Sequence, residues 1–170
     1  MIQHIIGHTP LYVWAILALL VQRGVSASRD RDMSVRKLCI IPLVMTALSL
    51  QGIASAFGMD GVAPLAWLAG ALAAAALLWR MGAPAGVTAD PARGMIRQPG
   101  SWTPLALMLS IFCLKYALAV SLAMAPELRH APLFTLAVCA LYGVFSGVFA
   151  GRLLRSLAVY HRAGKVAALA

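Results

Sequence analysis

The residue with the most unusual setting in this sequence is Lys115, which lies about midway along the apolar run 102–125, within SIFCLKYALAV. A lysine at the centre of a membrane-spanning helix costs about 2.5–3.5 kcal/mol on insertion scales, so something must offset that cost. Two explanations are open. Lys115 lines a water-filled cavity and attracts an anionic or carbonyl-bearing ligand, or it is held neutral or hydrogen-bonded to backbone carbonyls for structural reasons.

The groups that surround such a lysine decide its chemistry. No Asp or Glu falls within any long apolar run, so Lys115 has no evident ion-pair partner there. This counts against proton- or sodium-coupled transport through an acidic relay. We predict a ligand-binding site formed by Lys115, Tyr116 and Gln51. Other polar groups within the runs include Thr46, Ser49, Ser55, Ser110, Ser121, Tyr142 and Ser146.

A second set of candidate ligands is formed by histidines. His4 and His8 are spaced i, i+4, so they share a helix face, and His130 lies in a separate polar connection. Imidazole suits Zn, Cu or Fe, including haem iron. The alternative is that these histidines bind nothing, since His4 lies close to the chain terminus. We predict no cofactor, with a metal or haem as the alternative.

Catalytic motifs are absent from the sequence. It contains no Walker loop, GxGxxG, HExxH or GxSxG pattern, and no acid within the apolar runs to complete a Ser-His-Asp triad. We therefore expect no enzymatic activity.

Composition indicates the elements that position these residues. The chain has 170 residues, of which 62% are hydrophobic and 11% charged, against roughly 45–50% and 25% in soluble domains. The sequence also contains long apolar runs of about 20 residues, a length that is typical of transmembrane helices. We predict an all-α, polytopic transmembrane bundle with a single domain, 1–170. The expected spans are 3–22, 38–57, 62–79, 102–125 and 133–154.

The orientation of the bundle follows from its basic residues. Five spans bring twelve of the 14 Lys and Arg residues to one side, leaving only Arg129 on the other and Lys115 within a span. The positive-inside rule makes the basic side cytoplasmic. We therefore predict an external N-terminus, a flexible cytoplasmic loop 80–101 and a cytoplasmic tail 155–170. The tail either continues the fifth helix or lies along the membrane surface.

The first run differs from a cleaved signal peptide. A signal peptide carries basic residues before its apolar stretch, whereas here Arg23 follows the run. We expect a retained helix. Because the net charge of +9 collects in the predicted cytoplasmic segments, we predict the lipid bilayer, rather than nucleic acid, as the partner.

Small residues recur at every fourth position in two of the runs. They are Gly143, Gly147 and Gly151 in the fifth and Ala66, Gly70 and Ala74 in the third. Such ridges let helix backbones approach closely. They serve packing within the chain, or association with a second copy or another membrane protein.

Three segments also resemble a family of small, functionally uncharacterised bacterial inner-membrane proteins: HTPLYVWAILALLVQRGVSASRDR, SVRKLCIIPLVMTALSLQGI and PGSWTPLALMLSIFCLKYAL. The resemblance implies a polytopic helical protein and brings no catalytic residues. The charged segment RGVSASRDRDMSVRK is expected to set the topology and to contact anionic lipid, with docking of a partner as the alternative. Local pairs between its alternating Arg and Asp residues would contribute little, because they are exposed.

These observations lead to one functional hypothesis with two alternatives. The leading hypothesis is a membrane protein that binds or transports a small solute or anion near Lys115. The alternatives are an accessory or scaffold subunit that associates through the glycine ridge, and a redox or metal- or haem-binding protein that uses His4 and His8.

Overall fold

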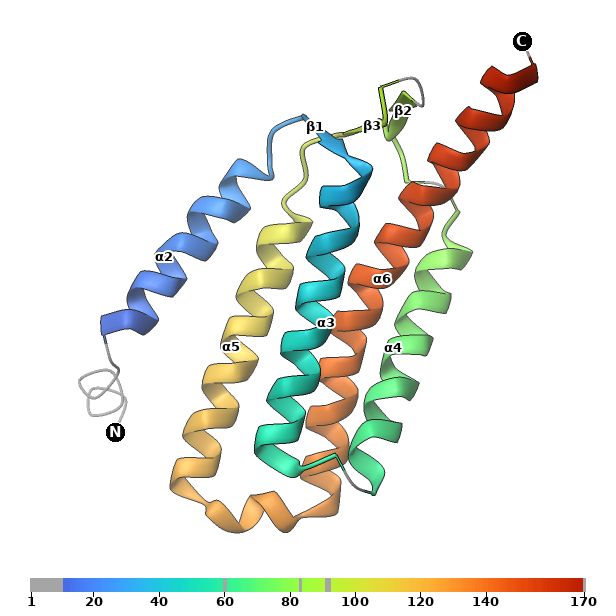
Figure 1. Ribbon diagram of the computed structural model, residues 1–170. Coiled ribbons are helices and arrows are strands. Elements are labelled where there is room, and N and C mark those ends of the chain that lie inside the picture. Colours follow the sequence, from blue (N-terminus) through green and yellow to red (C-terminus); the bar gives the residue numbers. More distant parts are fainter. Residues whose placement is uncertain (1–10, 60, 83, 91–92, 170) are drawn as a thin grey trace.

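The computed structural model describes residues 11–59, 61–82, 84–90 and 93–169, and most of the chain is helical. The long helices run alternately up and down (Figure 1). They are α2 (Leu11–Ser26), α3 (Val35–Phe57), α4 (Val62–Arg80), α5 (Thr103–Met124) and α6 (Pro132–Leu169), with a short 3₁₀ helix, η1 (Pro126–His130), before α6.

Four helices, α3 to α6, are long and apolar enough to cross a membrane. They coincide with the predicted runs 38–57, 62–79, 102–125 and 133–154, because an apolar run of about 20 residues matches the ~30 Å of bilayer hydrocarbon. The first predicted span, 3–22, overlaps α2, which has 16 residues in the described part of the chain. Beyond residue 154, the chain continues as helix α6.

Many large apolar side chains on these helices face outward. Leu43, Leu65 and Leu133 are 72%, 66% and 82% exposed, respectively. A soluble monomer rarely exposes contiguous apolar surface on this scale. A helical protein whose outer faces contact lipid accounts for this pattern.

The closest packing joins α4 and α6, which make the most extensive contact between any two described elements. A Cβ atom added to Gly70 would collide with the carbonyl oxygen of Ala140. One added to Gly143 or Gly147 would collide with the carbonyl oxygen of Trp67 or Ala71, respectively. Glycine is therefore required where the two backbones meet.

A small sheet caps one end of the bundle. Strands β1 (Arg31–Ser34), β2 (Thr88–Asp90) and β3 (Met95–Gln98) form an antiparallel sheet in the order β1-β3-β2. The register pairs Arg31 with Gln98 and Ser34 with Met95 across β1 and β3. On the inner side Ile96 is fully buried and Met33 nearly so. The sheet thus ties the connection after α2 to the connection after α4.

This sheet corrects one expectation from the sequence and shows a long-range contact. The segment 80–101 contains two of the three strands rather than only a flexible loop. Asp30 pairs at a distance instead of with its neighbours: its carboxylate accepts a hydrogen bond from the Gly100 backbone N–H at 2.7 Å and lies 3.8 Å from the Arg97 guanidinium. Strands of three or four residues leave little periodicity to detect, and the pairing of β1 with β3 joins residues more than 60 positions apart.

Candidate functional site

An apolar groove of about 210 Å³ runs between α3, α5 and α6. Its depth results from uneven packing, since α5 contacts α2 and η1 but meets α6 only sparsely. The lining is formed by Met45, Leu48, Ser49, Met108, Ile111, Phe112, Lys115, Tyr142, Phe145, Ser146 and Phe149. The volume lies below the ~300–1,000 Å³ typical of pockets for drug-sized ligands, so it suits a slender or small molecule.

Lys115 is the charged residue of this lining. It lies twelve residues after the start of α5 and nine before its end, about 18 Å and 14 Å along the helix axis. Its side chain is exposed and forms no hydrogen bond or ion pair with any residue in the described part of the chain. A cation with three donor hydrogens therefore faces an otherwise apolar surface.

The polar residues beside Lys115 use their hydrogen bonds within the bundle. Trp67 Nε1 donates to Ser49 Oγ at 3.0 Å, and the Ser49 hydroxyl donates to the Tyr142 carbonyl at 3.4 Å. Ser146 donates to the same carbonyl at 3.1 Å. These bonds join α3, α4 and α6 into one wall. They leave Lys115 as the main polar group offered to a ligand from the opposite side.

Residue positions place these groups at a similar height. Lys115 is nine residues from the end of α5, Ser49 is eight from the end of α3, and Tyr142 is ten from the start of α6. At 1.5 Å per residue all three lie about 12–15 Å from the same end of the bundle. Lys115 therefore lies at the same height in the bundle as the hydrogen-bonded groups of Ser49 and Tyr142 in the groove wall.

The chain matches a protein family over nearly its whole length. The model of a family of unknown function (DUF6622) matches residues 1–165. This chain belongs to that family.

The match includes both walls of the groove and most of α6, and confirms the predicted resemblance at the level of an uncharacterised family. No curated protein and no solved structure matches the chain. The function of this family member must therefore be inferred from its own residues.

Of the three predicted ligand residues, only Lys115 lines the groove. Tyr116 instead stacks on Phe112, with ring centroids 6.4 Å apart and planes 9° apart, while Gln51 is exposed on α3. Each residue turns about 100° around a helix axis. Tyr116 therefore leaves the face of Lys115, and Gln51 lies almost opposite Ser49.

Helical spacing does identify the true lining of α5. Met108, Ile111, Phe112 and Lys115 follow an i, i+3, i+4, i+7 pattern and share one face. These apolar residues are not among the predicted ligand residues, although their helical spacing is visible in the sequence.

The predicted packing residues lie at the α4–α6 contact. Gly143 and Gly147 face the α4 backbone, and Gly151 faces Leu78. From α4, Gly70 and Ala74 are buried, and Ala66 packs beside the core. The ridge of α6 thus packs against α4 within the chain.

Of the predicted metal ligands, only His130 lies in the described part of the chain. His4 and His8 lie outside the described residues, and His130 is exposed at the end of η1. Within the described ranges, no group of three or more His, Cys, Asp or Glu side chains has the geometry to hold a metal ion.

Proposed function

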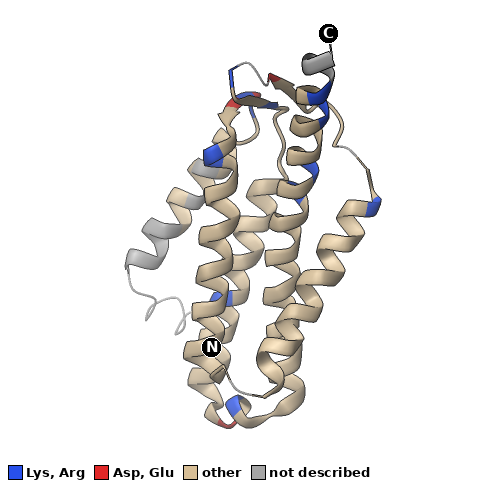
Figure 2. Ribbon diagram, turned by 45° about the vertical axis from the view of Figure 1, so that its right-hand side comes forward, with Lys and Arg blue, Asp and Glu red and all other residues tan. Residues whose placement is uncertain are grey.

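We propose that this chain is a multi-pass inner-membrane protein with five spans, α2 to α6, an external N-terminus and a cytoplasmic C-terminus. Lys and Arg residues gather at the end that holds the β-sheet cap and the C-terminal part of α6 (Figure 2). The positive-inside rule favours a cytoplasmic location for that end. The leucines exposed on the outer faces of the helices favour a location of the bundle within lipid.

We further propose that the α3–α5–α6 groove binds a small molecule with an apolar body and an anionic or carbonyl end. Transport of such a molecule is an extension of this binding. The observation that supports the proposal is the position of Lys115, a cation without a protein partner among the described residues, on an apolar groove at mid-helix.

The chemistry of the lining narrows the ligand class. An ammonium group in an apolar setting is stabilised most by an oxygen acceptor, and best by an anionic one. The methionines and phenylalanines that flank it favour hydrocarbon or an aromatic ring. A fully hydrated inorganic ion would gain little from such walls. An amphiphile such as a fatty acid, or a lipid-soluble carbonyl compound, fits both parts.

A binding measurement tests this proposal. The purified protein in maltoside micelles is titrated with a fluorescent polyene fatty acid and, separately, with its methyl ester, which keeps the carbonyl but lacks the charge. We expect saturable binding of one molecule per chain. Lys115→Met should weaken binding of the acid by about ten-fold or more, because a hydrogen bond to a charged group contributes about 1.5–3 kcal/mol.

The matched control is Lys37→Met, which removes the same charge from an exposed position in the first turn of α3. It should leave binding unchanged. Dependence of the ester on Lys115 would identify carbonyl recognition, whereas dependence of the acid alone would identify anion recognition. Equal binding by wild type and Lys115→Met for both probes contradicts the proposal.

A further inference from the structure

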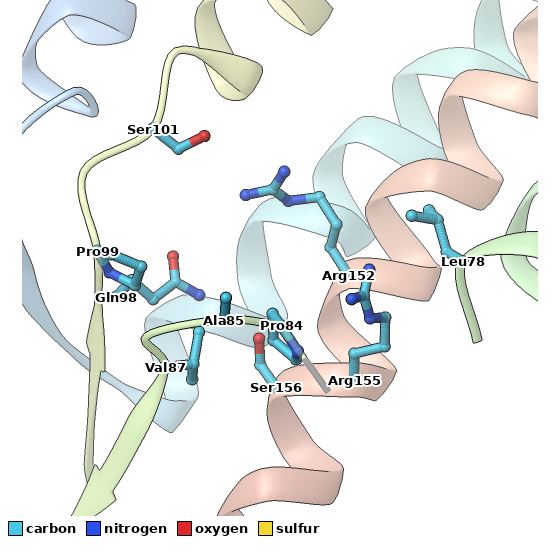
Figure 3. Close-up of a pocket in the computed structure, with 10 residues that line it drawn as sticks. All are labelled: Leu78, Pro84, Ala85, Val87, Gln98, Pro99, Ser101, Arg152, Arg155 and Ser156. Atoms are coloured by element: carbon cyan, nitrogen blue, oxygen red, sulfur yellow. The ribbon is translucent and has the colours of Figure 1, made fainter. Parts of the chain in front are cut away.

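A second pocket, of about 260 Å³, lies between the β-sheet cap and the bundle, away from the Lys115 groove. Its polar lining comes from two directions. Gln98 and Ser101 belong to β3 and the connection to α5, and Arg152, Arg155 and Ser156 belong to α6. Figure 3 shows the Arg152 guanidinium, the Gln98 amide and the hydroxyls of Ser101 and Ser156 directed at a shared space.

The charge of this pocket is unbalanced. Arg152 is half-buried and forms no ion pair with a described residue, and no Asp or Glu belongs to the lining. The ion pairs found among the described residues are elsewhere, at Arg93–Asp90 and Arg97–Asp30. Arg155 and Arg31 lie close enough for their charges to repel Arg152. Like charges held together in a partly buried site favour a bound anion.

Some of the hydrogen-bonding groups of the pocket are engaged and others are free. The Ser101 hydroxyl accepts a hydrogen bond from the Thr103 backbone N–H at 3.2 Å and lies 2.9 Å from the Thr103 hydroxyl. Arg155 Nε donates to the Gly82 carbonyl at 2.5 Å, which fixes that side chain. Arg152 makes no hydrogen bond with any described residue. Ser156 is only 4% exposed, and its hydroxyl likewise has no described partner. Two guanidinium groups, an amide and two hydroxyls form a donor set suited to the several oxygens of a tetrahedral oxyanion.

The position of Arg152 along α6 matches the depth of a lipid headgroup. It lies twenty residues after Pro132, the first residue of the helix. At 1.5 Å per residue this is about 30 Å, the thickness of bilayer hydrocarbon. If α6 enters the hydrocarbon near Pro132, the pocket lies where phosphate groups of the opposite leaflet are found.

We propose that this pocket binds a phosphate group through Arg152 and Arg155, with Gln98, Ser101 and Ser156 as additional ligands. The group belongs either to an anionic phospholipid headgroup or to a free phosphate compound. The site is separate from the Lys115 groove and does not depend on the function proposed for it.

The test uses the full chain in phosphate-free maltoside micelles and calorimetric titration at constant ionic strength. One arm adds inorganic phosphate, and the other adds short-chain phosphatidylglycerol. We expect one site per chain in at least one arm. Saturation by inorganic phosphate identifies a free phosphate compound as a ligand, whereas saturation by the lipid alone identifies a headgroup site.

Variants distinguish binding in this pocket from nonspecific attraction of anions to the basic residues of the protein. Arg152→Gln should weaken binding by about ten-fold or more, because it removes a charged donor. Arg36→Gln removes the same charge from an exposed position outside the pocket and should change binding less than about two-fold. Ser156→Ala, a smaller change, should weaken binding about three-fold or more without affecting net charge.

Two results would overturn the proposal: no saturable binding in either arm, or equal weakening by Arg152→Gln and Arg36→Gln. If Arg152→Gln fails to fold, Ser156→Ala decides the outcome, and unchanged binding by that variant then counts against the site.

Discussion

Along the seam between α4 and α6, glycines face backbone carbonyls, whereas along the groove beside α5, bulky side chains and a lysine face one another. Both regions are built from helices of similar apolar composition. At the seam, Gly70, Gly143 and Gly147 let the backbones meet. At the groove, α5 meets α6 only sparsely, and bulky residues such as Met108 and Phe112 line the space between them. The spacing of small residues, rather than hydropathy, thus decides which helix pairs close and which leave space for a ligand.

The largest expected effect is at the seam. Gly143→Leu inserts a side chain against the Trp67 carbonyl, where no rotamer avoids the backbone of α4. We expect it to lower the free energy of unfolding by about 3 kcal/mol, at the upper end of overpacking costs. The measurement is dodecyl sulfate titration of the protein in maltoside micelles, followed by circular dichroism. Ala137→Leu, on an exposed face of the same helix, is the control and should have little effect.

An intermediate effect of opposite sign is expected at the groove. In ligand-free protein, Lys115→Met removes an ammonium group from an apolar surface, so the free energy of unfolding should rise. The gain has an upper limit of about 2.5–3.5 kcal/mol, the insertion cost of a central lysine, and should be nearer 2 kcal/mol because Lys115 is exposed. The same titration measures it. A loss of stability would show that Lys115 has a structural role, and would contradict the proposal that it lies in the groove to bind a ligand.

The two regions also differ in how far the sequence predicts them. The helices follow from apolar run lengths, and the ridge on α6 follows from glycines at every fourth position, both of which are local patterns. The groove depends on which helices α5 fails to contact, and that is decided by tertiary packing. Lys115 stands out in the sequence through its place midway along an apolar run. The positions of Tyr116 and Gln51 outside the groove follow from the 100° turn per residue and from tertiary packing. The cap is harder to predict, because its strands are short and β1 pairs with β3 more than 60 positions away.

The smallest expected effect distinguishes a glycine at the groove side from those at the seam. Gly52 of α3 faces the Tyr142 ring, and a Cβ atom there would lie 3.7 Å from the nearest ring carbon, an ordinary van der Waals distance. Gly52→Ala should therefore raise the free energy of unfolding by about 0.5–1 kcal/mol, since alanine loses less backbone entropy in a helix. Gly70→Ala is the paired measurement and should be destabilising, because its Cβ would collide with the Ala140 carbonyl. If both substitutions destabilise the protein equally, α3 packs as closely on α6 as α4 does, and the contrast between seam and groove does not hold.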